Sequence, residues 1–118
     1  MYTEHLSDEE LLDSPLAEKW KKEAREYWEK WLPQWSAQLK KERKFESTLN
    51  QYVVNALRLW SRAYIDLCEN PEVKDEPDFL KRAGKMKVAS HMAEELAKET
   101  WLFLPPEREA LRRDRETT

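Results

Sequence analysis

The side chains best suited to acid–base or metal chemistry are few in this chain. His91 and Glu95 stand four residues apart, a spacing that places both on one face of a helix, where together they could bind a metal ion. A protein metal site needs more ligands than two, and the sequence holds no second pair at helical spacing. An exposed polar pair accounts for the same pattern without a metal and is the preferred interpretation.

Nucleophilic and phosphate-binding chemistry finds equally little support. Cys68 is the only cysteine, so no intramolecular disulfide forms, and its apolar neighbours predict a small buried side chain. This fits a reducing compartment. One glycine in 118 residues cannot build a glycine-rich phosphate loop. We therefore predict that the protein is not an enzyme and uses no cofactor and no metal, with an enzyme acting through His91 as a remote alternative.

The element that positions everything else is a helix predicted over residues 47–69. Apolar side chains recur there at steps of one, three and four, and they cover most of the circumference. Its polar residues form one narrow stripe. Such a helix is typically buried on most sides, so we expect it to be the central helix.

Further helices are predicted on both sides of this segment. Ser14 and Pro15 form a capping start, and Pro33 either kinks that helix or begins a new one. The prolines and acids of residues 70–78 predict an exposed loop, and the last long helix is expected from about Asp78 to Leu102. Its expected packing face includes Phe79, Met86, Ala93 and Ala97, with Ala89, Met92 and Leu96 widening it. Pro106 then opens a short final helix through Leu111.

These patterns predict an all-α protein with four to five helices in an antiparallel array around the helix at 47–69. The predicted divisions are a mobile acidic arm at 1–14, one helical domain at 15–111 and a flexible tail at 112–118. Ser7 and Glu10 have capping-box spacing, so one short helical turn could form in the arm if it finds a partner surface.

The bulk composition agrees with this fold and limits the partners. Charged residues make up 38% of the chain and the net charge is −3, which argues against a large non-specific nucleic-acid surface. No apolar run approaches 18 residues and no leader is recognised, so we expect a soluble intracellular protein without membrane contact.

Tryptophans and a basic cluster are the features with a possible binding role. Trp20, Trp28 and Trp31 recur on one stripe, which predicts core packing or, alternatively, an aromatic platform for bases or a partner helix. Positive charge gathers at residues 40–44. It either complements the dipole at a helix C-terminus or forms a phosphate-binding patch.

The order of several segments resembles the short, all-helical small terminase subunits of tailed bacteriophages. Their opening helix has a Trp, an apolar residue and Pro, and their second helix ends in an aromatic residue, Arg and Ala-Tyr. A charged loop re-enters the last long helix, and the end combines an apolar residue, Pro, Arg and Leu. The matching stretches here are Tyr27–Pro33, Leu57–Tyr64, Pro77–Ala83 and Trp101–Leu111.

The resemblance implies a DNA-packaging role in the cytoplasm of an infected bacterial host. Small terminase subunits assemble into homo-oligomeric rings, recognise double-stranded viral DNA and regulate the large terminase subunit. As a hypothesis, the DNA-binding face comprises Lys40, Lys41, Arg43, Lys44, Lys81, Arg82 and Lys85. Tryptophans are numerous for so small a core, so the hypothetical subunit interface comprises Trp20, Trp28, Trp35 and Trp101.

A second interpretation belongs to a different class. A small phage or mobile-element protein could bind and inhibit a host protein, with the acids between Glu4 and Asp13 imitating nucleic acid. Such an inhibitor is expected to be a monomer or dimer, whereas a terminase subunit is expected to form a ring.

Overall fold

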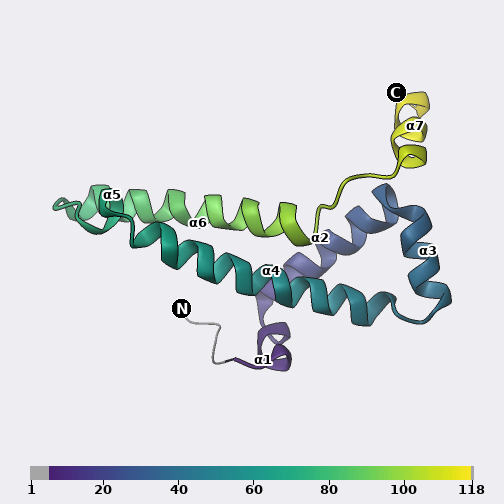
Figure 1. Cartoon of the computed structure of the whole chain (residues 1–118), viewed down its shortest axis with the longest axis horizontal. Coiled ribbons are helices and arrows are strands. Elements are labelled where there is room, and N and C mark those ends of the chain that lie inside the picture. The colour runs from purple at the N-terminus through teal and green to yellow at the C-terminus, as the bar shows by residue number, and fades with distance from the viewer. Residues whose placement is uncertain (1–5, 118) are drawn as a thin grey trace.

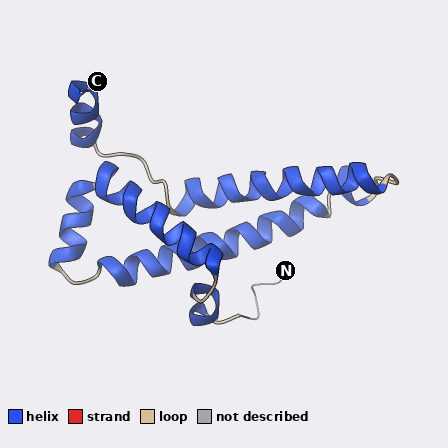
Figure 2. Cartoon of the chain, turned by 180° about the vertical axis from the view of Figure 1, so that it is seen from behind, coloured by secondary structure: helices blue, strands red, loops and turns tan. Residues whose placement is uncertain are grey.

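The computed structural model describes residues 6–117, and these residues form helices joined by short connections. No strand occurs among them (Figure 2), so the predicted all-α class is confirmed. The helices are α1 (Asp8–Leu12), α2 (Pro15–Trp31), α3 (Pro33–Lys41), α4 (Phe45–Cys68), α5 (Pro71–Lys74), α6 (Phe79–Trp101) and α7 (Arg108–Thr117).

Helices α4 and α6 run antiparallel and form a long hairpin that projects from the rest of the chain (Figure 1). The molecule is accordingly elongated, measuring 53 × 37 × 19 Å along its principal axes. The hairpin is tight because Ala89, Ala93 and Ala97 follow at four-residue steps and are all buried. Small side chains at this spacing present one smooth face on which another helix can approach closely.

Helix α4 corresponds to the predicted central segment and contacts α1, α2, α3, α5 and α6. Its buried side chains include Leu49, Val53 and Val54, which belong to one core with Trp20 and Trp28 of α2. The core therefore lies where α2 crosses α4. At the tip of the hairpin, α5 packs against both α4 and α6.

The boundaries of α2 and α3 follow from their capping residues. The Ser14 hydroxyl accepts a hydrogen bond from the Ala17 backbone N–H at 3.1 Å, and Pro15 occupies the first helical position. A new helix begins at Pro33, because Leu32 adopts φ −127° and ψ 52°, outside the helical region. Of the two possibilities for Pro33, the structure shows the new helix.

The N-terminal segment differs from the mobile arm predicted over residues 1–14. Ser7 and Glu10 form the expected capping box, and the resulting turn α1 packs on α4 and α2 with Leu11 buried. Arg58 of α4 holds it by ion pairing with Asp8 at 2.8 Å. The turn thus has the partner surface that a single helical turn requires. Residues 1–5 lie outside the described part of the chain.

The C-terminal segment also differs from its prediction. Residues 112–117 belong to α7, where a flexible tail was expected, and Arg112 pairs with Glu109 at 2.5 Å within that helix. Helix α7 contacts the body mainly through α2, and its Ala110 is buried. The loop predicted at 70–78 contains the short helix α5, whose first turn is capped by Asn70.

Candidate functional site

The His91–Glu95 pair lies on the exposed side of α6. Within residues 6–117, no group of three or more His, Cys, Asp or Glu side chains is placed to hold a metal ion. The structure therefore brings no third ligand to this pair, and both side chains belong to the surface of the hairpin.

Cys68 is half-buried at the end of α4, close to Tyr64. Burial first, and then a hydrogen bond with Cys68, raise the pKa of Tyr64. The predicted full burial of Cys68 is therefore only partly met, because α4 has fewer neighbours near its C-terminal end.

The predicted basic patch falls into two clusters at opposite ends of the long axis (Figure 1). Lys40, Lys41, Arg43 and Lys44 occupy the turn between α3 and α4, whereas Lys81, Arg82 and Lys85 lie at the start of α6, beside the hairpin tip. The idea of one continuous DNA-binding face within a single chain is thus wrong. Helical periodicity places residues around an axis, but it does not show which ends of two helices meet.

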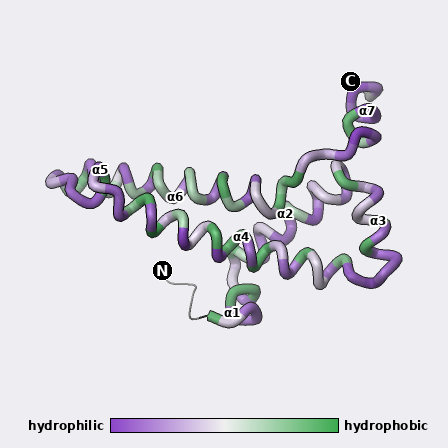
Figure 3. The backbone as a smooth tube through the Cα atoms, viewed as in Figure 1, coloured by the Kyte–Doolittle hydropathy of each residue, from purple (hydrophilic) through white to green (hydrophobic). Residues whose placement is uncertain are grey.

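The turn between α3 and α4 is strongly hydrophilic (Figure 3) and brings four basic residues together within five positions. Lys40 is engaged, since its Nζ pairs with Glu29 at 2.7 Å and lies 4.9 Å from the centre of the Phe45 ring. Lys41, Arg43 and Lys44 are exposed, and they form no ion pair with any residue between 6 and 117. This turn therefore offers three positive charges to solvent. For convenience we refer to residues 40–44 as the basic turn.

Arg43 ends helix α3 in an unfavourable backbone conformation, with φ 59°. The Lys44 N–H bonds to the Leu39 carbonyl at 2.8 Å, and the Arg43 N–H bonds to the Lys40 carbonyl at 3.1 Å. This is a Schellman ending, whose left-handed position glycine normally occupies because a Cβ there is strained. An arginine thus stands where glycine would be more stable, which makes its charge a candidate for function.

One of the three basic residues at the hairpin tip has an ion-pair partner. Lys85 pairs with Glu76 at 3.0 Å and also donates to the Glu72 carbonyl at 2.9 Å, so it ties α5 to α6. The hydrogen bond from Lys85 lowers the pKa of Glu76. Lys85 therefore has a structural partner that its sequence position did not reveal.

The four tryptophans predicted at a subunit interface separate into two kinds. Trp20 and Trp28 are fully buried within one chain, at 0% exposure, so they are core residues and not interface residues. The Trp28 Nε1 donates to the Leu102 carbonyl at 2.7 Å and anchors the end of α6 on α2. Trp35 and Trp101 are half-buried, and both rings pack against Tyr52. This correction has a simple cause: α2 contacts four other helices, α1, α3, α4 and α7, so its tryptophan stripe is enclosed.

The apolar surface missing from the sequence interpretation lies on α6. Val88, Met92 and Leu96 follow at four-residue steps and are 58%, 53% and 48% exposed. We call these three residues the apolar row. Met92 and Leu96 were expected to help bury α6, and so were Phe79 and Met86, which are also exposed. The buried alanines and the apolar row lie on different sides of α6, and only contacts with other helices distinguish them.

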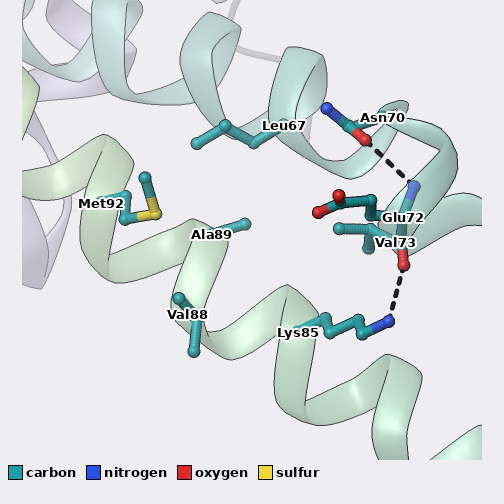
Figure 4. A pocket seen from close by; sticks show the side chains of 8 residues that line it. All are labelled: Leu67, Asn70, Glu72, Val73, Lys85, Val88, Ala89 and Met92. Carbon is teal, nitrogen blue, oxygen red and sulfur yellow. Dashed lines mark hydrogen bonds between the residues drawn. The ribbon is translucent and has the colours of Figure 1, made fainter.

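A groove borders the apolar row where the hairpin meets α5. It has a volume of about 340 Å³ and is lined by Leu67 of α4, Val73 of α5, and Val88, Ala89 and Met92 of α6 (Figure 4). Asn70, Glu72 and Lys85 close its polar end. The apolar row and this groove form one continuous apolar surface, which we call the hairpin surface.

Comparison with known proteins gives no relative: the chain matches no protein-family model, no curated protein and no solved structure. Across residues 6–117, no helix has both the length and the apolar character needed to cross a membrane.

Proposed function

We propose that this chain acts by assembly and binding, as a non-catalytic phage DNA-packaging subunit of the small terminase type. In this proposal copies of the chain form a ring, recognise double-stranded viral DNA and regulate the large terminase subunit in the cytoplasm of the infected bacterium. The specific form rests on the sequence resemblance described above. The observation that carries the assembly role is the hairpin surface.

Exposed apolar side chains support assembly for an energetic reason. Burying apolar surface yields about 25 cal/mol per Å², and large contiguous apolar patches usually mark interaction sites. Along the apolar row, α6 leaves Val88 and Met92 more than half exposed and Leu96 almost half exposed. A projecting helical pair with this surface would gain stability from a partner.

The basic turn supports a role for DNA. In one copy this turn offers the charges of Lys41, Arg43 and Lys44 to a phosphate backbone, and so few contacts give weak binding. Several copies in one assembly would present the same turn repeatedly, and avidity would then raise the affinity without new contacts. An assembly also reconciles the net charge of −3 with DNA binding, because it would repeat a turn that is locally basic.

A DNA-binding measurement with charge-reversal variants at the two ends of the molecule tests the proposal. Fluorescence anisotropy of a labelled duplex of roughly 40 base pairs is followed as the salt concentration rises. The wild-type affinity should fall with salt. Reversing the charges of Lys41, Arg43 and Lys44 together should weaken binding and reduce the slope of log K against log salt by about 3.

The control reverses Lys81 and Arg82, which lie at the other end of the molecule. If the two variants weaken binding equally, the basic turn is not the DNA contact. If the wild-type protein binds no duplex at low salt, with or without the large subunit, the packaging role is refuted. Inhibition of a host protein would then be the remaining hypothesis.

A further inference from the structure

A row of exposed polar and charged side chains runs alongside the apolar row, and its charge changes sign along α6. We call it the charged row. Lys87, His91, Glu95 and Glu99 follow at four-residue steps, each one residue before or three residues after a member of the apolar row. All four are exposed, and Lys87, Glu95 and Glu99 form no ion pair within residues 6–117. The charged row is therefore basic toward the start of α6 and acidic toward its end.

We infer that the hairpin surface binds a second copy of this chain, with two α6 helices packed antiparallel about a two-fold axis near Met92. This inference rests on the homo-oligomeric assembly in the proposed function and names one of its contacts. Because a two-fold contact closes at two copies, a ring also needs a second, different interface between pairs. An isologous contact uses the same patch on both subunits, so the patch must complement itself. The apolar row and the charged row both satisfy this requirement.

The apolar row is self-complementary in its register. With Met92 at the axis, position i on one helix lies level with position 184 − i on the other, so Val88 is level with the partner's Leu96. Rows of residues four apart are the ridges that most often interdigitate when two helices pack. The axis thus sets three apolar side chains of one copy against the same three of the other.

The charged row is complementary only if the helices are antiparallel. The same register brings Lys87 of one copy between the levels of Glu95 and Glu99 of the other, and the two-fold axis repeats this contact. A parallel arrangement would instead oppose Lys87 to Lys87 and Glu95 to Glu95. Unlike charges attract across an interface and like charges exclude the wrong orientation, so the charges select the antiparallel pair.

The groove gives the pair more area than a helix–helix contact alone. It opens beside Val88 and Met92 and continues to Leu67 and Val73, so apolar side chains from a second hairpin can enter it (Figure 4). The contact would then be a four-helix arrangement made of two hairpins, with the apolar side chains enclosed. In a ring built this way, the pair is the repeating unit and the number of subunits is even.

Met92→Glu tests the contact, with Leu80→Glu as the control. Both residues are exposed on α6, at 53% and 78%, so neither change should unfold the chain, but only Met92 lies in the apolar row. In the pair, Met92→Glu would bury two carboxylates facing each other. Sedimentation velocity over a range of concentrations measures the dissociation constant of the pair. For Met92→Glu this constant should be at least about tenfold higher than for the wild type. Leu80→Glu should match the wild type.

A charge swap tests the orientation separately. Lys87→Glu and Glu95→Lys should each weaken the pair about threefold, and the double variant should recover most of the loss, because the reversed charges again meet their opposites. Failure of the double variant to recover would overturn the antiparallel arrangement. An unchanged mass for Met92→Glu, or a wild-type protein that stays monomeric at about 100 μM, would overturn the contact itself.

The outcomes also separate this inference from the proposed function. A two-fold pair that binds no DNA would keep the inference and refute the packaging role. A ring that binds DNA and survives Met92→Glu would refute the inference and keep the packaging role.

Discussion

The carboxylate of Glu107 caps helix α3 by accepting a hydrogen bond from the backbone N–H of Trp35 at 3.0 Å. Its other oxygen accepts from the Gln34 N–H at 2.9 Å, and the Glu107 N–H donates to the Trp31 carbonyl. Leu32, which precedes α3, offers no capping side chain. The segment after α6 thus supplies the cap that α3 lacks and spans the break at Pro33.

Glu107→Ala should lower the free energy of unfolding by about 1–2 kcal/mol, because two backbone donors of α3 lose a charged acceptor. Glu107→Gln keeps one carbonyl acceptor, so its loss should be about half as large. Urea denaturation followed by circular dichroism measures both. Glu109→Ala is the control, because Glu109 lies two residues further along the chain and pairs with Arg112 of its own helix. This change should alter stability by less than about 0.5 kcal/mol.

This cap also shows where sequence interpretation ends. The starts of α1 and α2 were predicted from Ser7 and Ser14 because a cap and its helix are neighbours in sequence. Glu107 lies more than seventy residues from the helix that it caps, and no local pattern connects them. The same limit explains the basic residues, which were grouped by charge, although the fold places them at opposite ends of the molecule.

The faces of α6 illustrate a second limit. Apolar residues cover much of this helix, so periodicity alone could not separate the buried alanines from the exposed Val88 and Met92. In α2, core packing was one interpretation of the tryptophan stripe and holds for Trp20 and Trp28, whereas their assignment to a subunit interface is wrong because other helices enclose them. Which apolar face is covered depends on the tertiary contacts of each helix.

Arg43→Gly should stabilise the fold by about 1 kcal/mol, because glycine adopts the left-handed conformation without a Cβ clash. Arg43→Ala retains the Cβ and should give no such gain. Thermal denaturation of the three proteins measures the difference. An equal gain for both variants would mean that removing the positive charge, and not relief of the backbone, is responsible.

Gly84 lies within α6, and a Cβ added there would meet no atom within 4 Å. Gly84→Ala should therefore raise the free energy of unfolding by about 0.5–1 kcal/mol, since alanine restricts the unfolded chain and favours the helix. The exposed neighbour Ala83 provides the reverse control, because Ala83→Gly should lower stability by a similar amount. Chemical denaturation is the measurement. No gain for Gly84→Ala would contradict a regular helix at this position.

Glu46 links α4 to α2 through Arg25 and Lys21. The hydrogen bond from Arg25 is the main cause that lowers the pKa of Glu46 in the folded protein below its ordinary value of 4.5. Because the unfolded state binds this proton more readily, the contribution is complete above the unfolded pKa and is lost as pH falls through the folded pKa. Between about pH 7 and about pH 3, the wild type should lose more stability than Glu46→Gln.

Urea denaturation at both pH values measures this difference, and Glu18→Gln is a control because Glu18 is exposed and makes no ion pair with residues 6–117. Parallel pH dependences for the wild type and Glu46→Gln would show that the contact with Arg25 does not contribute.

The mass of the wild-type protein in solution tests the central claim most directly, because the packaging role and the two-fold pair both require copies of the chain to associate. Light scattering behind a sizing column, at micromolar concentration, compares the particle with the 14.3 kDa chain. We predict an even number of copies, roughly eight or more, as expected for a closed ring of pairs. A particle with the mass of a single chain would contradict the account.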